Sequence, residues 1–164
     1  RVQVRLPSLR RAGKWRYMAR IYSISTDNGS GVAVPTLMRL DFDGAAFTET
    51  PLVEGIEELE IEYGIDTDGD GDPDGYGPDP STFTIAACTT CDPVSNALNV
   101  VSARVHLLAR NLETSPGFTD TKTYTLGRDA GGQTVEVTPG GNVRRHAYSG
   151  LVRIVNVSQR RDLP

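Results

Sequence analysis

Residues 52–74 read LVEGIEELEIEYGIDTDGDGDPD, and this stretch decides the fold. From Glu58 to Tyr63, glutamates alternate strictly with apolar residues. A period of two is typical of a half-buried β-strand, whose apolar face packs on the core while its polar face meets water. The predicted core face holds Leu59, Ile61, Tyr63 and Ile65, and the predicted solvent face holds Glu58, Glu60 and Glu62.

The second half of the stretch is an aspartate loop, with one acidic residue at every second position. Its carboxylates are those of Asp66, Asp68, Asp70, Asp72 and Asp74. Like charges this close repel one another, and the intervening glycines and proline interrupt a regular ladder, so the strand must end here. A divalent cation removes the repulsion, and alternate oxygens on a tight loop suit calcium. The loop therefore predicts a Ca²⁺ site.

Comparison with the EF-hand pattern assigns the ligands of this site. Asp66, Asp68 and Asp70 take positions 1, 3 and 5, Asp72 offers its carbonyl at position 7, and Asp74 falls at position 9. Position 12, where a bidentate Glu is usual, is Gly77, so a further oxygen such as that of Asp79 must be recruited, or the site stays weak. We expect an extracellular type of affinity, about 10⁻⁴–10⁻³ M. The alternative is a solvated acidic turn without an ion.

Length and composition predict one folded domain. The chain has 164 residues, of which 38% are hydrophobic and 23% are charged, which suits a single globular domain over residues 1–164. Residues 1–14 are predicted as a basic connector or edge, and residues 66–95 as a long loop that holds the aspartates and both cysteines. No apolar run is long enough to span a membrane. Since the chain starts at Arg1, we expect it to be a processed or truncated piece.

Charge is segregated along the chain. Residues 1–20 carry seven Lys or Arg and no acid, whereas residues 41–92 carry fifteen Asp or Glu and no base. The segments either pair within the fold or offer a charge match to another molecule.

The remaining pattern predicts an α+β fold that is mostly antiparallel β, with long loops. Alternating or β-branched segments are bounded by Gly, Pro, Asn and Asp, as expected for strands. The predicted strands are residues 15–24, 36–42, 45–49, 56–65, 99–110, 122–126, 134–138 and 144–157.

Cys88 and Cys91 are separated by two threonines. This spacing occurs in redox motifs and in half zinc sites, but there is no second cysteine pair, and the two histidines lie far away in sequence. We predict a small structural disulfide that shapes a loop in an oxidising compartment.

The other polar residues do not indicate an enzyme. His106 is predicted to lie on a strand face with Arg104 and Arg110, as an exposed or hydrogen-bonded histidine. Arg144, Arg145 and His146 either form a solvated charge cluster or contact a phosphate or a neighbouring subunit. The serines lack a nucleophile-elbow motif, and the glycines form no phosphate-binding loop. We therefore predict no catalytic residues and no enzymatic activity.

Several segments in this order resemble the C-terminal half of type IV pilus minor pilins of the PilW kind. They are residues 52–57, 62–66 with the DxDGDG loop, 100–110, 122–124 and 144–148. The resemblance covers about residues 36–157. It implies a pilin-like globular domain whose N-terminal pilin helix is missing from this chain. That helix would anchor the full-length protein in the membrane.

The resemblance also implies a function and a location. Such proteins are secreted structural subunits that help to initiate pilus assembly and sit near the fibre tip with other major and minor pilins. They pass from the periplasm and inner membrane to the extracellular pilus on the cell surface. An oxidised Cys88–Cys91 pair and a calcium loop fit that environment.

Two other functions stay open. One is a calcium-dependent adhesin, a binding module on the cell surface. The other is DNA capture by the basic N-terminal segment and the Arg144–His146 cluster, which predicts binding that falls steeply with salt.

Overall fold

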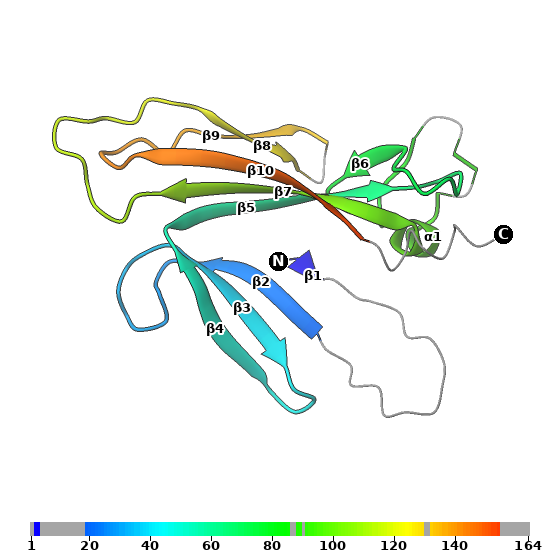
Figure 1. The fold of residues 1–164 in the computed structure, drawn as a ribbon, viewed down its shortest axis with the longest axis horizontal. Coiled ribbons are helices and arrows are strands. Elements are labelled where there is room, and N and C mark those ends of the chain that lie inside the picture. Colours follow the sequence, from blue (N-terminus) through cyan, green and yellow to red (C-terminus); the bar gives the residue numbers. More distant parts are fainter. Residues whose placement is uncertain (1, 4–18, 86–87, 90, 130–131, 155–164) are drawn as a thin grey trace.

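The described part of the chain folds into two four-stranded antiparallel sheets and a two-stranded ribbon, as the computed structural model in Figure 1 shows. The structure describes residues 2–3, 19–85, 88–89, 91–129 and 132–154. The first sheet has the order β1 (Val2–Gln3), β2 (Ala19–Ser25), β3 (Thr36–Phe42) and β4 (Phe47–Glu54). The second sheet has the order β10 (Arg145–Arg153), β7 (Val100–Arg110), β5 (Ile56–Ile65) and β6 (Gly75–Gly77).

The ribbon pairs β8 (Tyr124–Arg128) with β9 (Thr134–Val137). The helix α1 (Pro93–Leu98) is short and begins at Asp92, whose side chain accepts hydrogen bonds from two backbone N–H groups. The predicted mostly antiparallel β fold is confirmed, and α1 is the sole α-helix among the described residues. No helix within these ranges is long and apolar enough to cross a bilayer. Most of the predicted N-terminal connector and the start of the strand predicted at 15–24 lie outside the described residues.

The two large sheets are joined at Gly55, between β4 and β5. Its backbone N–H donates to the carbonyl of Pro35 at 2.6 Å, and its carbonyl accepts from the N–H of Arg110 at 2.8 Å. Gly55 has φ +81°, a left-handed conformation that favours glycine. The chain turns here from the first sheet into the second, and the first sheet is drawn below β5 in Figure 1.

The pairing of β5 with β7 forms the centre of the second sheet. Ile61 lies opposite Val105, and Glu62 lies opposite Arg104. At one end of the pair, Arg110 lies 3.5 Å from Glu57. The strands predicted at 56–65 and 99–110 are therefore neighbours, and they set the register of this sheet.

The core lies on the face of the sheet that was predicted to meet water. Leu108 packs with Tyr124 and Leu126 of β8, so the ribbon covers this face. Glu62 is consequently only 5% exposed, while Leu59 and Ile61 on the opposite face are half-buried. The prediction that the β5 carboxylates face water is wrong for Glu62, because alternation within one strand does not reveal which face a distant hairpin will cover.

Candidate functional site

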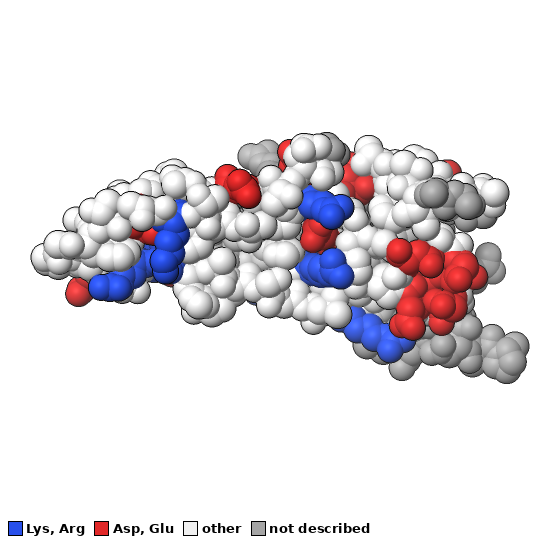
Figure 2. Space-filling view, turned by 90° about the horizontal axis from the view of Figure 1, so that it is seen from above, with Lys and Arg blue, Asp and Glu red and all other residues white. Residues whose placement is uncertain are grey.

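The aspartate loop leaves the sheet at the end of β5 and returns to it through β6. Its closing bond runs from the N–H of Asp74 to the carbonyl of Ile65, at 3.0 Å. Gly69 and Gly71 within the loop have φ +89° and +92°, and such values favour glycine. Acidic side chains gather at this end of the molecule in Figure 2.

Three of the five predicted ligands come together in the structure. Asp66, Asp68 and Asp74 each place a carboxylate oxygen within 4.8 Å of the others. Asp66 is buried, whereas Asp68 and Asp74 are exposed. Neither Asp70 nor Asp72 joins this group among the described residues.

Hydrogen bonds from the loop itself fix these carboxylates. Asp66 accepts from the N–H groups of Gly69 at 2.6 Å and Gly71 at 3.0 Å. Asp74 accepts from the hydroxyl and the N–H of Thr67, both at 2.6 Å, and these bonds hold the pKa of Asp74 below its usual range. The group thus brings together hard carboxylate oxygens, which is the donor chemistry of a calcium or magnesium site.

Asp79, the predicted extra ligand, is not part of the group among the described residues. Its carboxylate instead accepts from the N–H of Ser81 at 2.8 Å.

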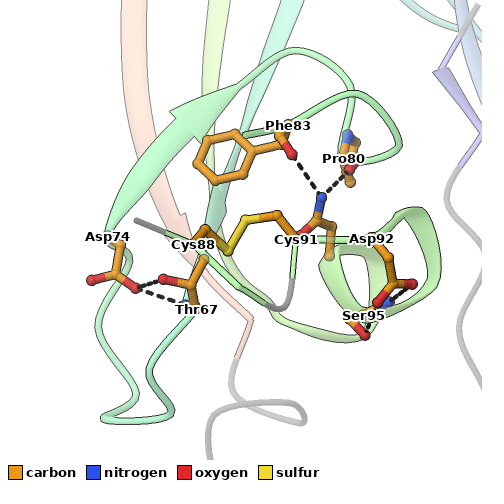
Figure 3. Close-up of a disulfide and its surroundings, with 9 residues drawn as sticks. Thr67, Asp74, Pro80, Phe83, Cys88, Cys91, Asp92 and Ser95 are labelled. Atoms are coloured by element: carbon orange, nitrogen blue, oxygen red, sulfur yellow. Dashed lines mark hydrogen bonds between the residues drawn. A yellow bond between two sulfur atoms is a disulfide. The ribbon is translucent and has the colours of Figure 1, made fainter. Parts of the chain in front are cut away.

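The disulfide lies beside this loop. The sulfurs of Cys88 and Cys91 are bonded, as predicted, and their Cα atoms are 5.7 Å apart. Figure 3 shows the bridge between the Thr67–Asp74 hydrogen bonds and the start of α1. The buried amide of Asn96 in α1 donates to the carbonyls of Pro80 and Phe83, both at 2.9 Å. The long segment between β6 and α1 is therefore held in place by the disulfide and by the hydrogen bonds of Asn96.

The basic cluster at 144–146 divides into different environments. Arg145 has a 6% exposed side chain that pairs with Glu57 and with Asp120. Arg144 lies over the ring of Phe118 at 4.5 Å, and His146 lies against Tyr148. The solvated-cluster hypothesis is wrong for Arg145, because its two carboxylate partners come from segments far away in sequence.

A second polar constellation was not predicted. His106 on β7 lies 3.2 Å from the carboxylate of Glu62 and 3.1 Å from the hydroxyl of Ser149 on β10. Of the two alternatives predicted for His106, the hydrogen-bonded one is confirmed, but its partners Glu62 and Ser149 were not predicted. Only the register of three strands brings these residues together, with Ser149 directly opposite His106.

Comparison with known proteins identifies the family. A family model described as Type IV Pilus-assembly protein W matches residues 21–156, which is most of the chain. Neither the curated proteins nor the solved structures include a match. The chain belongs to the PilW family of type IV pilus-assembly proteins.

Proposed function

We propose that this chain is the globular part of a minor pilin, a structural subunit that assists the initiation of type IV pilus assembly near the fibre tip. The family match over residues 21–156 carries this proposal. The antiparallel sheets and the Cys88–Cys91 bridge support it, because disulfides persist outside the reducing cytosol. Its partners are other major and minor pilins and a tip adhesin. It resides in the periplasm and inner membrane before assembly and on the extracellular pilus afterwards.

Deletion of the encoding gene is expected to abolish or strongly reduce surface pili, because initiation precedes fibre growth. Pili are counted by electron microscopy in the parent strain, the deletion strain and a strain complemented with the full-length gene. Normal pilus numbers combined with lost surface attachment would contradict the assembly role and favour the calcium-dependent adhesin.

We further propose that the aspartate loop binds calcium and thereby orders the exit from β5. Asp66, Asp68 and Asp74 bring three carboxylates within 4.8 Å, a spacing at which like charges repel strongly unless a cation lies between them. The amide donors of Gly69 and Gly71 hold Asp66 in place, so the loop needs little rearrangement to coordinate an ion. The remaining ligands come from backbone carbonyls or water, as calcium accepts.

Calcium is expected to stabilise the chain. With a Kd of about 1 mM, 10 mM calcium adds about 1.4 kcal/mol to the free energy of unfolding. Thermal unfolding of the chain is measured in EDTA and across a calcium titration, in the wild type and in Asp68→Asn. The substitution should remove the rise in Tm, because it deletes one of the three clustered carboxylates.

Asp72→Asn serves as the matched control, since Asp72 is an exposed loop aspartate outside the cluster. It should retain the response to calcium. A wild-type Tm that does not change up to 20 mM calcium, or an equal loss of response in both variants, contradicts the site.

A further inference from the structure

A polar hollow lies between the β8–β9 ribbon and the second sheet. Its volume is about 550 Å³, within the range of small-molecule sites. Side chains from six strands line it, including Tyr76 from β6, Arg128 from β8 and Thr134 from β9. On the face seen in Figure 2, basic side chains lie on either side of an acidic one near the middle of the molecule.

The floor of the hollow is a fixed chain of hydrogen bonds. The side chains of Glu62 and His106 are only 7% and 14% exposed, and Glu62 Oε2 lies 3.2 Å from His106 Nε2. On its other side the ring is hydrogen-bonded to Ser149, with Nδ1 3.1 Å from the hydroxyl oxygen. A hydroxyl has one donor and two acceptor lone pairs, so Ser149 Oγ, which lines the hollow, can accept a hydrogen bond from a ligand whichever way its bond to His106 runs.

Gly127 allows the β8–β9 ribbon to pack closely over the hydrogen-bonded side chains of Glu62 and His106. It has φ +79°, and an added Cβ would lie 2.9 Å from Cδ2 and 3.0 Å from Nε2 of the His106 ring. A side chain at this position would therefore displace the imidazole from the floor of the hollow.

Two guanidinium groups border the hollow, those of Arg104 and Arg128. Arg104 lies opposite Glu62 in the strand register, yet Glu62 bonds to His106, and Arg104 stacks 3.5 Å over the ring of Tyr76. Within the part of the chain that the structure describes, neither Arg104 nor Arg128 has an ion pair with a carboxylate. A stacked guanidinium keeps its edge free for the bidentate bonds that a carboxylate accepts.

We propose that this hollow binds a hydroxylated carboxylate of the uronic-acid class. The arginines Arg104 and Arg128 bind the carboxylate, and a ligand hydroxyl donates to Ser149 Oγ. Thr125 and Thr134 line the same hollow, and their hydroxyls would add partners for a polyhydroxylated ring. Such a ligand is a free sugar acid or one residue of an acidic polysaccharide. This site lies apart from the aspartate loop, and its occupancy does not depend on the proposed role in pilus assembly.

The test is an NMR titration of the 164-residue chain with galacturonate, galactose, acetate and inorganic phosphate. Galacturonate should shift the amide signals around the hollow and bind at least about tenfold more tightly than the other three, because each lacks the carboxylate, the hydroxyls or both. Equal affinity for galactose, acetate or phosphate overturns the assignment, as does no shift up to 100 mM galacturonate. A titration with tetragalacturonate distinguishes a free sugar acid from a polysaccharide as the ligand. Tighter binding of the oligomer than of galacturonate indicates a polysaccharide, and equal binding indicates the free acid.

Variants locate the site. Arg128→Gln, at an exposed strand end, should weaken galacturonate binding by about tenfold or more, and Arg104→Gln should do the same. Ser149→Ala should reduce the preference for galacturonate over acetate. Arg153→Gln is the matched control, because Arg153 is an exposed arginine on β10 that does not line the hollow. Unchanged binding in Arg128→Gln, or an equal loss in Arg153→Gln, contradicts the proposal.

Discussion

Replacing Arg145 by methionine is expected to lower the free energy of unfolding by about 3 kcal/mol. The Arg145 guanidinium donates to both carboxylate oxygens of Glu57, to Asp120 at 3.1 Å and to the carbonyl of Gly140 at 2.6 Å. The side chains of Glu57 and Asp120 are 15% and 0% exposed. Methionine fills a similar volume but leaves the buried Asp120 without its cation and leaves Glu57 with Arg110 alone, at 3.5 Å. The desolvation cost of an unpaired buried charge is large.

The pKa values of the network agree with this role. The hydrogen bonds to Glu57 raise the pKa of Arg145 further above its usual value. Burial alone would raise the pKa of Asp120, but the bonds from the Lys122 N–H, Arg145 and Tyr124 hold it below its usual range. Asp120 therefore remains charged at neutral pH and needs its partner.

Arg144→Met is the matched control for this substitution. Arg144 is the exposed neighbour, and its guanidinium contacts the ring of Phe118 instead of a carboxylate. It should cost less than about 1 kcal/mol, the usual range for surface contacts. Urea denaturation followed by circular dichroism gives both values. Equal midpoints for the two variants would show that the buried network contributes little.

The second large effect is expected from Gly55→Ala, at the junction of the two sheets. An added Cβ would lie 2.7 Å from the carbonyl oxygen of Arg110 and 3.2 Å from the Leu112 side chain. The backbone contact cannot relax without moving β7, and the left-handed φ adds strain. We expect a loss of about 3 kcal/mol or more from the two terms together.

Gly44→Ala separates these two causes. Gly44 also has a positive φ, +107°, but an added Cβ there would meet nothing within 4 Å. Its cost should be confined to backbone strain, about 1 kcal/mol. Thermal unfolding of both variants makes the comparison, and similar losses would mean that the contact with Arg110 is easily relieved.

The features that were predictable lie within short stretches of sequence. The strand–loop junction at Ile65 and Asp66 follows from local alternation and local charge, and both are visible in the structure. The grouping of the five aspartates was predictable only in part, because the EF-hand comparison assumes a path for the backbone. Gly69 and Gly71 adopt positive φ values, and the resulting turns leave Asp70 and Asp72 outside the group that Asp66 forms.

Features that depend on long-range register were missed. Glu62 was assigned to solvent because nothing near it in sequence reveals the β8–β9 cover. Ser149 and His106 are 43 residues apart, and they meet only because β10 pairs with β7 in one register. Arg145 and Glu57 are separated by 88 residues, so the burial of Arg145 could not be read from its basic neighbours.

Strand β5 contributes to three separate sites: the Arg145 network, the polar hollow and the aspartate loop. The N-terminal end of β5 supplies Glu57 to the Arg145 network, and its middle supplies Glu62 to the polar hollow. Its C-terminal end leads into Asp66 of the aspartate loop. Register irregularities lie near both ends, between Ile56 and Glu58 and between Gly64 and Ile65. An insertion or deletion of one residue inside β5 would invert the side chains beyond it. The length of this strand is therefore constrained from both ends at once.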